Sequence, residues 1–248
     1  MSFLFQGPFL AAHELDVIGN AIDDVSHEWT RRAPSPLPIY TLGAATYLDA
    51  QQSSTAYKQV AGVKNTVLRH HFNWLHTRLI DFLCVHFGAA VLEQDLALPG
   101  FHIFGGRRDR PLPQSLCQFL EKTPASVHID IPYRNHFSHW LQYTEIDFLH
   151  PLSITVCIEL PTHGSGLHTW HALDKETELH GHPIIDHRFD KSQLANPDYN
   201  AYQRGWIYVS SGHHIHQIAL SQTFLPNDRR LTLQAHAIRC DGLWRVFF

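Results

Sequence analysis

Charged residues and long apolar runs are both scarce in this sequence of 248 residues. Only 17% of the residues are charged, and 19 basic side chains against 23 acidic ones predict no basic surface of the kind that a phosphate backbone requires. No run of about 18 consecutive apolar residues occurs, which argues against a membrane-spanning helix. We therefore expect neither a nucleic acid nor a membrane as a partner.

Signals for export and for cysteine-based sites are also lacking. Residues 1–20 have no positively charged start, and polar residues and a proline interrupt their apolar residues, so we expect a cytoplasmic location. No pair of cysteines has C-x-x-C spacing, which argues against a zinc ribbon or a disulfide framework. We expect buried, unpaired thiols at the four positions Cys84, Cys117, Cys157 and Cys240.

Buriable side chains, by contrast, are abundant. The 15 Phe, 8 Tyr and 6 Trp exclude a disordered chain, and we expect one domain over residues 1–248, with a helical part over 1–95 and a β core over 96–248. The unusual number is 21 histidines, which directs attention to metal sites.

Two helices with one apolar face each are predicted in the first part. The first covers residues 15–29 and ends before a proline-rich segment, and the second begins with Asn65 as N-cap and ends at Gly88 as C′ residue. We expect the apolar stripes of 15–29 and 68–82 to pack on the outside of a sheet, or to form a homodimer interface.

The period of apolar residues changes from 3.6 to 2 near residue 96. Alternation over residues 152–160, 205–210 and 230–238 predicts strands, and turn-rich pieces separate them. Short strands without interleaved helices predict a mainly β protein of the α+β class, with a sandwich or barrel.

One H-x-D motif occurs in the chain, in a stretch with the pattern of a strand. His128 and Asp130 are two residues apart, so their side chains project from the same face and can bind one metal ion. A third ligand from the histidines of residues 211–218 would complete two imidazoles and one carboxylate, the set that leaves open positions on Fe(II). Alternation excludes only His213 and leaves His214 and His216.

A basic residue and a hydroxyl follow on the next predicted strand. Arg230 and Thr232 share one face and can hold a distal carboxylate. Gln234 and His236 share that inward face. Arg229 lacks a threonine two residues later, so we expect Arg229 to face solvent.

In this order, H-x-D, a distal histidine in a G-x-x-x-H-x-I context and R-x-T resemble the Fe(II)/2-oxoglutarate-dependent oxygenases of the small bacterial type. Residues 96–104, 153–170 and 228–237 are also similar to stretches of that family, and the resemblance covers roughly residues 99–244. It implies a double-stranded β-helix (jelly roll, cupin-like) with the N-terminal helices on its outer sheet.

The resemblance also implies roles for individual residues. His128, Asp130 and His216 would bind iron, with His214 as the alternative distal ligand, and Arg230 with Thr232 would bind the 5-carboxylate of 2-oxoglutarate. The expected reaction is O₂-dependent hydroxylation of a small molecule, such as an amino acid or a related metabolite, with release of succinate and CO₂. The presence of Asp130 argues against a halogenase.

Substrate residues are harder to find in the sequence. We expect contacts from Arg134, after H-x-D, and from His168 and Trp170, in a histidine-rich segment that also contains His163, His171, His180, His182 and His187. A second metal site at His180 and His182 is weakly indicated, because a third spaced ligand is lacking.

Three other functions stay open at this point. These are a cupin-like metal enzyme or metal-binding module without 2-oxoglutarate, a peptide or protein hydroxylase, and a β-sandwich scaffold with incidental histidines. A cupin-like protein without 2-oxoglutarate has no need for an inward arginine and threonine. A scaffold leaves converging polar groups without a purpose.

Overall fold

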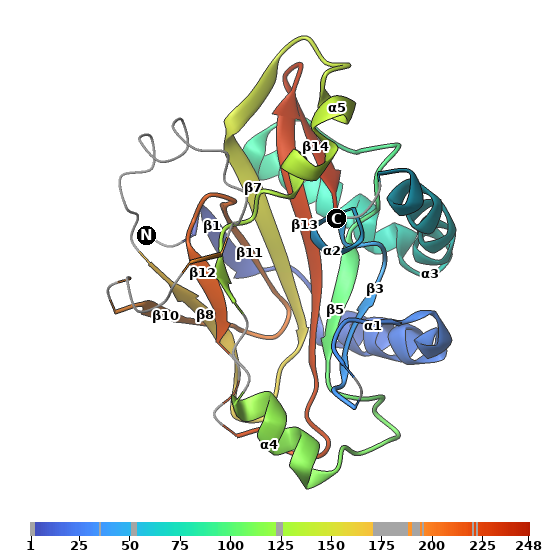
Figure 1. Ribbon diagram of the computed structural model, residues 1–248, viewed down its shortest axis with the longest axis vertical. Helices are drawn as coiled ribbons and strands as arrows, with labels where there is room; N and C mark the ends of the chain where they lie inside the picture. The colour runs from blue at the N-terminus through green and yellow to red at the C-terminus, as the bar shows by residue number, and fades with distance from the viewer. Residues whose placement is uncertain are drawn as a thin grey trace.

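The computed structural model describes residues 3–34, 36–50, 54–122, 126–170, 188–189, 194, 196–219, 221 and 223–248. Over these residues, strands form two sheets that face each other, and helices cover the outer face of the larger one (Figure 1). All described strand pairs are antiparallel except β14 with β4, which is parallel. This is the mainly β architecture that the sequence predicted. No helix of the described part combines the length and hydropathy that a membrane span needs.

The larger sheet has the strand order β1-β11-β7-β13-β5-β3-β2, and β14 and β4 extend it from β13. Its strands are β1 (Phe5–Pro8), β2 (Thr30–Arg31), β3 (Ile39–Leu42), β4 (Ala90–Leu92), β5 (Gly100–Phe104), β7 (Ile146–Glu159), β11 (Trp206–Ser211), β13 (Arg230–Cys240) and β14 (Leu243–Phe247). The predicted strands 152–160, 205–210 and 230–238 are therefore confirmed as β7, β11 and β13.

The smaller sheet has the order β10-β8-β12-β6-β9. Its strands are β6 (Val127–His128), β8 (Gly166–Thr169), β9 (Arg188–Phe189), β10 (Asp198–Ala201) and β12 (His216–Ala219). The central pair of β12 and β6 carries the H-x-D histidine and the distal histidine directly opposite each other. This pairing decides where the candidate metal ligands lie.

The helices are α1 (Ala12–Asp24), α2 (Thr46–Asp49), α3 (Ser54–Phe87), α4 (Gln114–Lys122) and α5 (Phe137–Trp140), with 3₁₀ turns at Ser26–Glu28 and Pro132–His136. Both expected helices exist, but their bounds differ from the prediction. The helix α1 ends five residues before Trp29, which is extended and donates its indole N–H to the carbonyl of Ile22.

The start predicted for the second helix is wrong, although its end at Gly88 is confirmed by the positive φ of 100° there. The helix α3 begins at Ser54, and Asn65 lies buried in its interior instead of capping it. The Asn65 amide donates to the Leu96 carbonyl at 3.0 Å and accepts the Leu98 N–H at 2.9 Å. The sequence pattern thus suggested a cap at a residue that in fact ties the helix to the segment before β5.

Packing of α1 and α3 on the larger sheet forms the main core, as predicted. Leu68, Phe72, Leu75 and Leu79 of α3 lie fully buried in one cluster with Ile18 and Ile22 of α1 and with Ile154 and Val156 of β7. The opposite face of β7 presents Ser153 and Thr155 to the space between the sheets. The larger sheet is therefore apolar toward the helices and polar toward the smaller sheet.

The first 95 residues do more than supply helices, since β1, β2, β3 and β4 all come from them and join the larger sheet. The short helix α4 also lies between β5 and β6, where no helix was expected. Cys117, Cys157 and Cys240 are buried as predicted, whereas Cys84 is exposed on the outer side of α3.

Candidate metal centre and ligand cavity

His128 and His216 are brought side by side by strand pairing. His128 ends β6 and His216 begins β12, and the two residues are direct partners in the antiparallel register. Their imidazole rings are 4.5 Å apart between centroids. Asp130 follows β6, and its backbone N–H donates to the Gly212 carbonyl at 2.7 Å, which fixes the residue beside the same pair.

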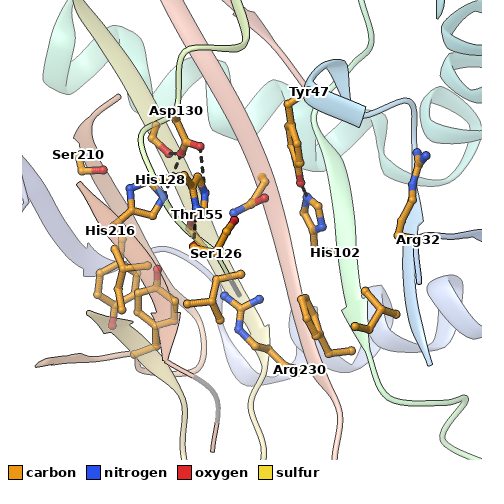
Figure 2. A pocket seen from close by; sticks show the side chains of 18 of the residues that line it. Arg32, Tyr47, His102, Ser126, His128, Asp130, Thr155, Ser210, His216 and Arg230 are labelled. Carbon is orange, nitrogen blue, oxygen red and sulfur yellow. Dashed lines mark hydrogen bonds and ion pairs between the residues drawn. The ribbon is translucent and has the colours of Figure 1, made fainter. Parts of the chain in front are cut away.

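The side chains of these three residues converge on one point (Figure 2). Asp130 Oδ1 is 3.6 Å from His128 Nε2, and Asp130 Oδ2 is 3.5 Å from His216 Nε2. One ligand atom from each residue lies within 4.8 Å of the others, and no other group of His, Cys, Asp or Glu in the described part of the chain was found to converge in this way. His214, the alternative, is not part of the cluster.

Backbone carbonyls orient both imidazoles. His128 Nδ1 donates to the Ser126 carbonyl and His216 Nδ1 donates to the His214 carbonyl, each at 2.8 Å. Because a carbonyl only accepts, Nδ1 carries a proton in both rings, and Nε2 is the ring nitrogen that faces Asp130. Outer hydrogen bonds of this kind are typical of histidines that bind a metal.

Asp130 is held as a carboxylate. Burial by itself would raise its pKa, but the neighbouring His216, His236 and His128 and a 2.6 Å hydrogen bond from Ser153 Oγ outweigh it and hold the pKa well below its usual range. Two imidazoles and one ionised carboxylate on a single face are the donor set that Fe(II) oxygenases use, and three further positions stay open on an octahedral ion.

A cavity of about 280 Å³ lies between the sheets and contains the cluster at one side. Arg230 lies lower in the same cavity, and Tyr47, His102 and Arg32 lie across from the cluster (Figure 2). The lining residues come from both sheets and from the first 50 residues of the chain.

Arg230 is the first residue of β13 and is fully buried. Its Nη1 lies 3.5 Å from Thr232 Oγ1, and its Nε and Nη2 have no hydrogen-bond partner among the described residues. The guanidinium carbon is 5.5 Å from the Phe104 ring and 5.9 Å from the Tyr202 ring. A buried, unpaired guanidinium is costly, so this end of the cavity is suited to an anion.

The prediction that Arg229 faces solvent is wrong. Arg229 is 4% exposed and binds Glu159 through Nε and Nη2, each at 2.7 Å, and Asp23 through Nη1 at 2.7 Å. Alternation along the chain sends Arg229 to the helix side of the sheet and Arg230 to the cavity side. All three nitrogens of the Arg229 guanidinium thus bind carboxylates of the protein, whereas Arg230 has nitrogens left for an anion in the cavity.

The predicted substrate residues are not brought to the cavity. His168 lies between Leu167, which lines the cavity, and Thr169 on β8, so its side chain points to the other face of the smaller sheet, where it contacts Tyr199. Trp170 is buried in a separate apolar cluster, and Arg134 in the 3₁₀ turn is not among the lining residues. His171, His180, His182 and His187 lie outside the described residues.

Sequence reasoning missed the lining residues that precede β6. Tyr47 belongs to no recognisable motif, and His102, although inside the stretch 96–104, was not singled out. His102 pairs with Thr232 across β5 and β13, so only the strand register places it in the cavity. Arg32 reaches the same wall and forms a two-pronged ion pair with Asp49, at 2.6 and 2.5 Å.

Tyr47 and His102 form a neutral hydrogen-bonded pair. The Tyr47 hydroxyl is 2.7 Å from His102 Nε2. Burial, with the charges of Arg230 and Arg32, lowers the pKa of His102 to about 3, and burial together with the charge of Asp130 raises the pKa of Tyr47 above its usual value. Both groups are therefore uncharged near neutral pH.

Solved structures with the same fold are found, whereas no family model and no curated protein sequence matches the chain. An N-substituted L-amino acid dioxygenase from Burkholderia ambifaria AMMD is 12% identical, with a TM-score of 0.52 over 98% of this chain and 85% of that one. The same dioxygenase in complex with α-ketoglutarate (2-oxoglutarate) gives the same values.

A lower similarity is found to the non-heme α-ketoglutarate-dependent epimerase SnoN from nogalamycin biosynthesis. That enzyme is 13% identical, with a TM-score of 0.47 over 96% of this chain and 79% of that one. At such identities the comparisons concern the fold alone. The fold of the Burkholderia ambifaria dioxygenase agrees with the resemblance of the sequence motifs. The protein is similar in fold to the Fe(II)/2-oxoglutarate-dependent oxygenases.

Proposed function

We propose that this protein is an Fe(II)- and 2-oxoglutarate-dependent oxygenase that hydroxylates a small molecule, with residues 1–248 as one cytoplasmic domain built on a double-stranded β-helix. The observation that carries the proposal is that one cavity holds both the His128, Asp130 and His216 cluster and a buried arginine with unpaired nitrogens. The first suits a divalent iron and the second suits a carboxylate.

The residues fit both cofactors by their chemistry. Two imidazoles and the Asp130 carboxylate match the ligand preference of Fe(II), and Ser153 keeps the carboxylate oriented. Arg230 and Thr232 would hold the distal carboxylate of 2-oxoglutarate, with the Phe104 and Tyr202 rings excluding water around the guanidinium. When bound, iron and 2-oxoglutarate supply the activation of O₂ for oxidation of a C–H bond, with succinate and CO₂ as products.

Other functions are less well supported. A cupin-like enzyme without 2-oxoglutarate leaves Arg230 buried and unpaired, and a scaffold leaves the metal cluster unexplained as well. A cavity of about 280 Å³ favours a small substrate or the reacting end of a larger one over a folded protein.

The class of the substrate is suggested by the fold comparison. The name of the Burkholderia ambifaria dioxygenase, which concerns N-substituted L-amino acids, supports an amino acid or a related metabolite. Dimerisation through the N-terminal helices stays a prediction.

Anaerobic titration with Fe(II) and 2-oxoglutarate tests the proposal. The wild-type protein is expected to develop the weak visible charge-transfer band of the chelated cosubstrate, and in air to convert 2-oxoglutarate to succinate when amino acids and their derivatives are screened. Asp130→Ala is expected to lose both properties while keeping its far-ultraviolet circular dichroism. Asp109→Ala, at an exposed carboxylate that pairs with Arg107, serves as the control and should behave as wild type. A band of unchanged intensity in Asp130→Ala would contradict the metal assignment.

A further inference from the structure

A second buried group with unpaired nitrogens lies on the cavity face of β13. His236 is 4% exposed, and neither ring nitrogen has a hydrogen-bond partner among the described residues. A neutral imidazole carries one donor and one acceptor, so both go unused in the ligand-free protein. Leaving them buried in this way costs free energy that a bound ligand can recover.

The position of His236 ties it to the metal cluster. It is not itself a lining residue of the cavity, but it follows Gln234, which is one, by two positions on the same face of β13. It pairs across the strands with Ser153, which donates to Asp130. Its ring centroid is 6.5 Å from that of Tyr47. Six residues of extended strand separate it from Arg230, about 20 Å between Cα atoms, so a dicarboxylate held by Arg230 does not satisfy it.

The side chains around His236 carry hydrogen-bonding groups but no spare charge. Tyr47 and His102 form the neutral pair described above, and Gln234 adds a neutral amide. Among the described lining residues, the charged ones are Arg32, Asp130 and Arg230. Asp49 neutralises Arg32. In the proposed function, the metal neutralises Asp130 and 2-oxoglutarate neutralises Arg230. The groups Tyr47, His102, Gln234 and His236 therefore offer no charge to an ammonium or a carboxylate group.

We propose that Tyr47, His102 and Gln234, which line the cavity, together with His236 beside Gln234, bind the substrate through an uncharged hydrogen-bonding group, such as an amide, a hydroxyl or a carbonyl. This inference rests on the proposed function, and it narrows the substrate to molecules whose end near the metal is polar but neutral. A free α-amino acid, with an ammonium and a carboxylate beside its Cα, does not match this wall, whereas an amide-blocked derivative does.

Stability measurements test the unpaired state of His236 without any ligand. Replacing His236 by Leu or Phe removes a buried donor and acceptor that have no partners, so the thermal midpoint of the full chain is expected to rise by roughly 2–4 °C. His76 is the matched control, because it is also fully buried but donates to the Pro99 carbonyl at 2.9 Å. His76→Leu is expected to lower the midpoint.

Binding of matched probes tests the substrate class. Four leucine derivatives differ mainly in charge: the uncharged N-acetyl-leucine amide, the anionic N-acetyl-leucine, the cationic leucine amide and zwitterionic leucine. Saturation-transfer NMR with the protein loaded with Zn(II) and 2-oxoglutarate, which prevents turnover, is expected to detect the uncharged probe at least tenfold more strongly than the others. His236→Leu is expected to abolish that preference and to retain the visible band with Fe(II) and 2-oxoglutarate.

Two results would overturn the inference. One is a charged probe that binds as well as or better than the uncharged one, or no binding of the uncharged probe at all. The other is a fall of the midpoint in both His236 variants, which would assign His236 a structural role. Failure of the proposed function is recognised separately, because it would appear as loss of the visible band in the wild-type protein.

Discussion

Neighbouring residues of the same type can serve opposite purposes, and Arg229 and Arg230 show how. Arg229 belongs to a buried ion-pair network on the helix side of the sheet, whereas Arg230 lies on the cavity side without an ion-pair partner. The chemistry of the guanidinium is the same in both. The face of β13 and the partners found there decide which one binds a carboxylate.

Substituting each arginine by leucine is expected to have opposite effects. Arg230→Leu should weaken 2-oxoglutarate binding roughly 100-fold, while leaving the free energy of unfolding unchanged or higher, because an unpaired buried charge is removed. Arg229→Leu should keep the affinity but lower the free energy of unfolding by roughly 3 kcal/mol, because Glu159 and Asp23 lose their buried partner.

Isothermal titration with 2-oxoglutarate in the presence of Zn(II), and urea unfolding, measure the two quantities on the same samples. Unchanged affinity in Arg230→Leu would remove the assignment of the 2-oxoglutarate carboxylate to this residue. A stable Arg229→Leu would show that the ion-pair network contributes little.

At the scale of elements, the long pair β7 and β13 determines which residues face the cavity. Their register shifts between Leu231 and Thr232, which pair with Glu159 and Cys157, so Ile158 is an extra residue in β7. The alternation predicted for residues 152–160 holds through Ile158, which lies in the same core cluster as Ile154 and Val156, and reverses at Glu159. Glu159 consequently lies on the helix side, where it meets Arg229, instead of on the cavity side with Thr155.

This arrangement makes stability depend on pH through Glu159. Burial alone would raise its pKa, but the hydrogen bonds and charges of Arg229 and Arg108 outweigh burial and hold it below the ordinary value of 4.5. Because the folded-state pKa is the lower one, the unfolded state binds more protons as the pH falls. The contribution of Glu159 is thus complete above the unfolded-state pKa and is lost as the pH falls through the folded-state value.

The expected result is a steeper loss of stability between about pH 5 and about pH 3 in the wild-type protein than in Glu159→Gln. Urea unfolding at several pH values measures it, and Glu145→Gln, at an exposed carboxyl group, serves as the control. Parallel curves for the wild-type protein and Glu159→Gln would show that other carboxyl groups cause the acid sensitivity.

At the scale of the whole molecule, the N-terminal part and the β core form one structure. The first 95 residues supply β1 at one edge of the larger sheet, β2 and β3 at the other, and β4 beside β14, and they also supply the helices that cover its apolar face. Tyr47 and Arg32 from the same part line the cavity. The helical segment predicted for residues 1–95 is therefore an integral part of the sheet and of the site.

A fragment of residues 96–248 is accordingly expected not to fold by itself. Without α1 and α3, the buried Ile154, Val156 and Leu233 would be exposed to water, a loss of about 2 kcal/mol for each such side chain. Urea unfolding of the fragment, compared with the full chain, should show no cooperative transition. A cooperative transition in the fragment would indicate that the β core is an independent domain.

The sequence by itself determined the features that depend on local pattern. Alternation predicted β7, β11 and β13, the apolar stripes predicted the packing of α1 and α3, and the spacing of His128 and Asp130 predicted one shared face. These features follow from the periods of strand and helix, which act over a few residues. The choice of His216 over His214 already needed the family motif, because both lie on one face by alternation.

The tertiary structure decided what depends on contacts between distant segments. The pairing of β6 with β12 brings His128 to His216, and the partners Glu159 and Asp23 distinguish Arg229 from Arg230. Tyr47 reaches His102 across 55 positions of chain, a contact that no local pattern encodes. Local periodicity determines which way a side chain points, whereas the packing of one segment on another determines which groups that side chain contacts.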